Sequence, residues 1–349
     1  MTAFATDGFT IGGTGGDASY NTNTATYVTW NWKGLSGSPS KTFTVTVTDP
    51  GSGNRYTLDG RVSGTNAVPV TIEEGGTYTF DQSAASNSGH PLRFSTTSDG
   101  THGGGTEYTT GVTTNGTPGS AGAWTKITVA ASAATLYYYC TNHSGMGAQA
   151  STPESGGGVS DLSGTIASVV NANTTAGFSI VKYTATGSAG TIGHGLSQAP
   201  DMIISKGYSS SAAYNWRVGG EKIGLTSANY SMRLDLTNAE NDNSNVFGAY
   251  PGASVWTIGN DAGVNDSGKD YIAYCFHSVE GYSRVGNYEG NSNADGPFIY
   301  TGFKPAFVLI KGVDPVSYTH LRAHETRQDG GWRVGGGKKK TSGGGGGGG

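Results

Sequence analysis

Residues 136–146 read Leu136-Tyr-Tyr-Tyr-Cys140-Thr-Asn-His143-Ser-Gly-Met146, an apolar, Tyr-rich run followed by a polar loop. Aromatic residues favour strands, whereas Gly and Asn favour tight turns, so the pattern predicts a strand that ends at Cys140. The loop places a thiol, an imidazole and a thioether close together in the sequence. These are ligand types that transition metals prefer, and Cys140, His143 and Met146 are therefore candidate metal ligands.

A second imidazole lies 50 residues upstream, at His90 in Ser88-Gly-His-Pro-Leu-Arg-Phe94. Two His, one Cys and a weak axial Met form the ligand set of a blue-copper site, so we expect His90, Cys140, His143 and Met146 to bind one copper ion. The alternative is a sandwich that carries no copper, in which Cys140 is a small buried hydrophobe. His102 could be a further ligand or a gating group, but we expect a solvated loop histidine.

Short alternating segments surround this loop. Thr, Val, Tyr and Phe recur with period two, and turn signals separate the segments at intervals of roughly ten residues. The predicted strands are Phe43–Thr48, Pro69–Ile72, Thr77–Phe80, Leu92–Phe94, Lys126–Val129 and Leu136–Cys140. The pattern predicts an all-β fold in which this part of the chain is a β-sandwich.

Residues 41–151 resemble a cupredoxin. The resemblance implies a Greek-key β-sandwich, with the first His ligand leaving an inner strand and the Cys, His and Met ligands on the loop before the last strand. It implies that His90 is the upstream imidazole, Cys140 the thiolate, His143 the second imidazole and Met146 the axial thioether. Since little sequence follows Met146, residues 147–150 would have to form the closing strand.

The rest of the chain contains repeats. Residues 199–207 resemble residues 304–312, and residues 177–181 resemble residues 281–285 at nearly the same offset, which indicates a duplicated unit. Residues 10–32 resemble residues 257–276, with Val28, Trp30 and Trp32 matching Ile272, Tyr274 and Phe276. We expect residues 1–34 to end an upstream module, 152–170 to be a Ser/Gly linker, and 171–315 to form a second β-sandwich-like module with the start of a next repeat.

The two cysteines are expected to stay unpaired. Cys140 is a predicted ligand, and Cys275 falls on the strand face opposite Ile272, Tyr274 and Phe276, the face predicted to lie on the core. A bridge between the two cysteines would remove the thiolate.

The C-terminal segment has a different character. Residues 316–326, Val-Ser-Tyr-Thr-His-Leu-Arg-Ala-His-Glu-Thr, resemble one reading frame of a transposase adapter used in DNA sequencing, and the chain ends in seven Gly. We expect residues 316–349 to be a disordered artefact and the gene to be truncated near Pro315. The alternative is a genuine basic tail that binds nucleic acid. Without this segment the chain has 15 Lys and Arg against 23 Asp and Glu, a balance that argues against nucleic-acid binding.

Composition excludes several classes of protein. The chain has 60 Gly in 349 residues but only 13% charged and 34% hydrophobic residues, unlike ordinary cytosolic enzymes. No dinucleotide, Walker, zinc-protease or nucleophile-elbow motif is present, so no enzyme activity is predicted. No apolar run is long enough for a membrane helix, and the N-terminal residues do not resemble a signal peptide.

The repeat unit resembles modules of virion-associated, tail-fibre-like proteins of marine tailed phages. The resemblance implies a structural or adhesion protein of the virion or extracellular space, with other virion proteins or a host-surface receptor or glycan as partners. Such fibres often form homo-oligomers, although no coiled-coil heptad supports this here. The alternatives are a blue-copper electron-transfer protein, or a domain in which copper serves mainly to stabilise the fold.

Overall fold

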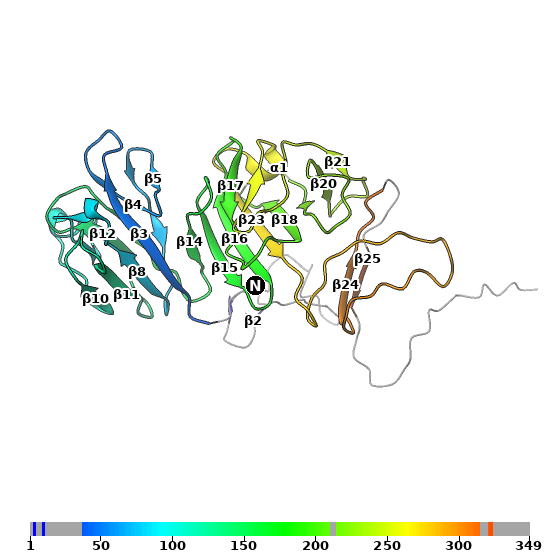
Figure 1. Ribbon diagram of the computed structural model, residues 1–349, viewed down its shortest axis with the longest axis horizontal. Coiled ribbons are helices and arrows are strands. Elements are labelled where there is room, and N and C mark those ends of the chain that lie inside the picture. The colour runs from blue at the N-terminus through cyan, green and yellow to red at the C-terminus, as the bar shows by residue number, and fades with distance from the viewer. Residues whose placement is uncertain (1–2, 5–8, 11–36, 210–213, 315–319, 324–349) are drawn as a thin grey trace, which may run out of the picture.

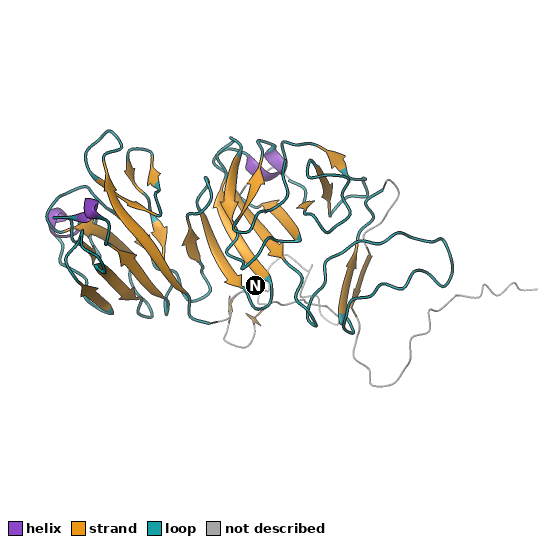
Figure 2. Ribbon diagram, viewed as in Figure 1, coloured by secondary structure: helices purple, strands orange, loops and turns teal. Residues whose placement is uncertain are grey.

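The computed structural model describes residues 3–4, 9–10, 37–209, 214–314 and 320–323. Within these ranges the chain is nearly all β, with two 3-10 helices, η1 (Ala85–Asn87) and η2 (Gly100–Gly103), and one short helix, α1 (Ala262–Asn265) (Figures 1 and 2). The all-β prediction is confirmed. None of the helices in this part of the chain is long and apolar enough to cross a membrane.

The first unit is a sandwich of two sheets, and it lies at one end of the molecule (Figure 1). One sheet has the order β10 (Val112–Asn115), β11 (Trp124–Thr128), β8 (Thr77–Asp81), β3 (Ser40–Thr48), β4 (Arg55–Leu58). The other has the order β7 (Val70–Thr71), β13 (Ala148–Ser151), β12 (Leu136–Cys140), β9 (Leu92–Ser95). A small hairpin of β5 (Val62–Ser63) and β6 (Asn66–Ala67) follows β4.

All the strands predicted for this sandwich are present, and the closing strand is β13. It pairs antiparallel with β12 and parallel with β7, just as β3 pairs parallel with β8. Strands distant in sequence thus become neighbours, as in Greek-key connections. The sequence did not predict β4 and β10, because their Thr, Asn and Arg residues do not alternate cleanly with apolar ones.

Aromatic rings fill the space between the two sheets. Phe80 lies 5.2 Å from Phe43 and 5.2 Å from Phe94, measured between ring centroids, and all three side chains are fully buried. Each buried ring stabilises the fold by roughly 1.5–3 kcal/mol relative to an exposed one. A domain with few Leu and Ile can therefore still build a core.

The segment predicted as a Ser/Gly linker, 152–170, is structured. It contains β14 (Val159–Asp161) and the start of β15 (Ser168–Asn173), and Leu162 belongs to the core of the first sandwich. The buried Glu73 carboxylate accepts the backbone N–H groups of Gly156, at 3.0 Å, and Gly158, at 2.6 Å. Small residues are needed there for the chain to wrap a carboxylate, so the linker-like composition has a structural cause.

The second unit is built on a long sheet. Its order is β14, β15, β16 (Phe178–Thr184), β23 (Asp270–Phe276), β18 (Met202–Gly207), β19 (Arg217–Gly219), β20 (Tyr230–Arg233), β21 (Asn241–Asp242). A pair formed by β17 (Gly190–Gly193) and β22 (Val255–Ile258) lies beside it, and Trp256 of β22 is buried against Tyr183 of β16.

The predicted core face of β23 lies on a core, but the opposite face is buried more deeply. Ile272, Tyr274 and Phe276 are half-buried, whereas Tyr271 and Cys275 on the opposite face are fully buried in the larger core. The reason is that β23 is a central strand covered on both faces, with Tyr274 and Phe276 packing on a smaller cluster around Met232.

Cys140 and Cys275 are unpaired, each in its own core. Val28, Trp30 and Trp32 lie outside the described residues, as does most of the upstream module predicted at 1–34, of which only β1 (Ala3–Phe4) and β2 (Phe9–Thr10) are described.

The repeat is reproduced in part. The copy at 199–207 contains β18, and the copy at 304–312 contains β24 (Phe307–Ile310). By contrast, 177–181 begins β16 whereas 281–285 contributes only the bridge between Val279 and Ser283. β24 pairs antiparallel with β25 (His320–Ala323), which lies within the adapter-like segment.

Buried His194 ties the loop after β17 to the start of β22. Its Nδ1 accepts the Leu196 N–H at 3.1 Å, so Nε2 carries the proton and donates to the Gly252 carbonyl at 3.2 Å. Burial lowers the pKa of His194 below its ordinary value. The imidazole is therefore neutral in the folded chain.

Acidification should destabilise the chain through His194. Below pH about 6.5 the unfolded chain binds a proton that the folded chain excludes, so the free energy of unfolding should fall by up to about 1.4 kcal/mol per pH unit. Urea unfolding between pH 8 and pH 5 measures this slope. His194→Asn should have a shallower slope than the wild type, and equal slopes would contradict the assignment of a neutral imidazole.

Gly147 allows β13 to lie against β12. A Cβ atom at this position would lie 1.7 Å from the Tyr138 carbonyl oxygen, which belongs to a central strand and cannot move aside. Gly147→Ala should lower the free energy of unfolding by about 3 kcal/mol. Gly37→Ala is the matched control, because a Cβ there meets nothing within 4 Å. Equal stability of the two variants in urea unfolding would refute this packing.

Candidate metal centre

His90 lies on the loop between η1 and β9. Gly89, at φ 76°, turns the chain toward the sheet, and the His90 carbonyl accepts two hydrogen bonds, from the Tyr56 hydroxyl at 2.7 Å and from Gln82 Nε2 at 2.8 Å. The Asn87 amide donates to the Val45 carbonyl of β3 at 2.8 Å. The loop that carries His90 and leads into β9 is thus held by groups in or next to β3, β4 and β8 of the opposite sheet.

Cys140 and His143 come from the end of β12 and the loop after it. Cys140 pairs with Leu92 of β9, which brings its side chain next to the His90 loop. Cys140 Sγ lies 3.8 Å from His90 Nδ1 and 3.6 Å from His143 Nδ1, and the ligand atoms of all three residues lie within 4.8 Å of one another. Three predicted ligands, separated by up to 53 positions in sequence, therefore converge.

The spacing of these atoms fits a shared metal ion. Ligands held about 2.0–2.3 Å from one ion at trigonal or tetrahedral angles lie roughly 3.5–4 Å apart. The two distances from Cys140 Sγ fall in this range. The His–Cys–His cluster can thus hold a metal with little rearrangement.

Met146 lies in the core of the same sandwich. Its side chain is buried, and its carbonyl accepts the Tyr56 N–H at 2.9 Å, which fixes the end of the loop against β4. The convergent cluster consists of His90, Cys140 and His143, and coordination by Met146 stays a prediction.

The electrostatics favour metal binding over proton binding. Burial, reinforced by the nearby His143, lowers the pKa of His90. Burial raises the pKa of Tyr56, and the neighbouring Cys140 raises it further, so the Tyr56 hydroxyl stays protonated as a donor. The neutral His90 imidazole keeps its ring nitrogen lone pair free for a metal ion.

Hydrogen bonds around the cluster join its loops. Asn142 Nδ2 donates to the Gly89 carbonyl at 2.9 Å, and the Gly145 N–H donates to Asp99 Oδ1 at 2.8 Å. His102, predicted as a solvated loop residue, is exposed but its Nε2 lies 3.1 Å from the Cys140 carbonyl. Sequence alone did not predict these roles, because no spacing rule connects Asn142 or His102 to a particular carbonyl.

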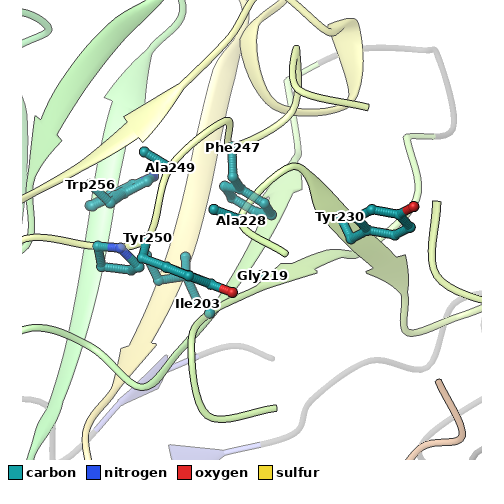
Figure 3. A pocket seen from close by; sticks show the side chains of 10 residues that line it. Ile203, Gly219, Ala228, Tyr230, Phe247, Ala249, Tyr250 and Trp256 are labelled. Atoms are coloured by element: carbon teal, nitrogen blue, oxygen red, sulfur yellow. The ribbon is translucent and has the colours of Figure 1, made fainter. Parts of the chain in front are cut away.

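A small surface hollow lies in the second unit, distant from the metal cluster in the sequence. Figure 3 shows Tyr230, Phe247, Tyr250 and Trp256 among the residues that line it. The residues that line this hollow are uncharged. It offers apolar contacts and the hydroxyl groups of Tyr230 and Tyr250.

These features define an all-β protein with a candidate His–Cys–His metal centre in its first sandwich. Residues 139–328 match a family described as a domain of unknown function, DUF7483, and the chain belongs to that family. The matched region includes Cys140, His143 and Met146, crosses the predicted boundary at 151, and extends into the adapter-like segment. No curated protein and no solved structure matches the chain.

The Asn142 link should contribute to metal affinity. Asn142→Ala removes the hydrogen bond between the two ligand loops, and loss of such an outer interaction typically costs 10–100-fold in affinity, so we expect a Kd for Cu(II) at least about tenfold higher. Competition titration against a copper chelator measures the change. Asn115→Ala is the control, because Asn115 makes a similar bond to Gly122 elsewhere on the sandwich. Unchanged affinity in Asn142→Ala would contradict this role.

Proposed function

We propose that the first sandwich is a cupredoxin-like domain that binds one copper ion through His90, Cys140, His143 and the axial Met146. The observation that carries the proposal is the convergence of two imidazole nitrogens on one buried thiol. One thiolate and two imidazoles, with a weak thioether, are the donor set of a blue-copper site. Copper held in this way can change oxidation state without exchanging ligands.

The residues of the chain have distinct roles in this proposal. Cys140 supplies the charge that binds the ion, and its burial keeps solvent from the sulfur. His90 and His143 present Nδ1 to the same point. Tyr56 and Gln82 hold the His90 backbone, and this support positions the imidazole before the ion arrives.

We propose further that the chain belongs to a structural or adhesion protein of a phage virion and has no enzyme activity. The repeat units and the Gly-rich, weakly charged β-array support this proposal, as does the resemblance to virion modules. The partners would then be other virion proteins or a host-surface receptor or glycan. Genes for virion proteins beside this gene are the expected observation, and their absence would argue against the proposal.

Electron transfer is the second candidate function. The observation in its favour is that His143 is exposed whereas Cys140 and Met146 are buried, which leaves one ligand at the surface for contact with a redox partner. A reversible one-electron wave in voltammetry of the copper-loaded chain would support this function. A chain whose copper cannot be reduced and reoxidised would exclude it.

Colour provides the test of the copper site. The full chain titrated with Cu(II) should turn intensely blue at one equivalent, because the Cys140 thiolate transfers charge to copper. Cys140→Ser should abolish the colour, whereas Cys275→Ala, which removes the thiol of the other core, should retain it. A colourless wild-type chain that binds Zn(II) but not copper would refute the copper assignment while leaving a metal centre.

A further inference from the structure

Two arginines are paired across neighbouring strands of the long sheet of the second unit. Arg217 of β19 pairs directly with Arg233 of β20 in an antiparallel register, so their side chains emerge on the same face with Cβ atoms about 5 Å apart. Like charges in this position normally destabilise a sheet. Some other interaction must offset this repulsion.

Arg217 is only 7% exposed and incompletely paired. Its Nη2 lies 3.3 Å from Asp261 Oδ1, while its Nε and Nη1 are buried without a hydrogen-bond partner among the described residues. The Asp261 carboxylate already accepts the Gly263 N–H at 2.8 Å and the Asn243 amide at 2.9 Å. Both Asp261 oxygens thus have other donors, and the carboxylate makes one hydrogen bond to Arg217 in place of the two parallel bonds of a bidentate pair.

Two neighbouring side chains also have buried polar atoms without a hydrogen-bond partner among the described residues. Arg233 Nε and Ser231 Oγ are also buried without a partner within the described ranges, and strand alternation places both side chains on the face of Arg217. Asp235 accepts the Trp216 N–H and the Asn215 amide, and no carboxylate of the described chain forms an ion pair with Arg233.

The buried atoms without partners can all donate hydrogen bonds. Guanidinium nitrogens can only donate, and the Ser231 hydroxyl can donate as well. Burial lowers the pKa of Arg217, Asp261 opposes this, and Arg233 lowers it further. Buried, unpaired donors with net positive charge are costly unless an acceptor completes them.

We propose that Arg217, Arg233 and Ser231 form a binding site for a small oxyanion: a carboxylate, sulfate or phosphate group. The planar fork of each guanidinium matches the geometry of such a group. Arg233 is half-buried and is the more exposed of the two arginines. The site lies in the second sheet, and it does not depend on the copper centre or on the role proposed for the whole chain.

Thermal unfolding of the full chain tests this site. Sodium sulfate, sodium phosphate and sodium glucuronate are compared with sodium chloride at matched ionic strength, and glucose controls for the sugar ring of glucuronate. At least one oxyanion should raise Tm saturably, by roughly 3–6 °C at concentrations far above its Kd. The responding salt identifies the group, because sulfate and phosphate present tetrahedral oxygens and glucuronate presents a carboxylate.

The variants distinguish a built site from general salt effects. Arg233→Gln should abolish the saturable rise, and Arg233→Lys should weaken binding at least about tenfold in calorimetric titration, because charge remains but the fork is lost. Arg284→Gln removes an exposed positive charge elsewhere and should behave as the wild type. Circular dichroism confirms that each variant folds. Equal responses to all salts, or a rise that persists in Arg233→Gln, would overturn the proposal.

Discussion

Cys140 ends β12 with its side chain fully buried, and its sulfur lies 3.8 Å from one imidazole nitrogen and 3.6 Å from another. Holding a thiol and two imidazoles at these distances requires rigid support from several directions. The first sandwich supplies it through the pairing of β12 with β9, through Tyr56 and Gln82 on the His90 carbonyl, and through the Asn142 amide between the two loops. Two glycines also support the arrangement of these three side chains. Gly89 turns the chain before His90, and Gly147 lets the chain after the ligand loop lie against β12.

The two units are joined by specific contacts. Buried Glu73 receives two backbone N–H groups from the connecting segment, the Thr71 N–H donates to Ser160 Oγ, and Leu162 extends the first core. The region matched by DUF7483 likewise runs from the ligand loop into the second sheet. The ligand loop and the second unit are therefore parts of one continuous family domain.

Sequence predicted the parts of this protein that depend on local pattern. Alternating Thr, Val, Tyr and Phe residues predict the main strands. The types of donor atom predict that His90, Cys140 and His143 lie together. Features that depend on long-range partners could not be predicted. The burial of β23 depends on what covers a central strand, and the linker-like Gly residues depend on Glu73. The incomplete pairing of Arg217 depends on the geometry of its contact with Asp261. None of these features produces a sequence motif with a fixed spacing.

X-ray absorption at the copper edge of the loaded full chain reports the atoms around the ion and so tests whether Cys140 binds copper. We expect one copper per chain with a single short copper–sulfur path and two imidazole nitrogens. Zero sulfur scattering, with copper surrounded only by oxygen and nitrogen, would contradict the assignment of Cys140 as the ligand on which the centre is built.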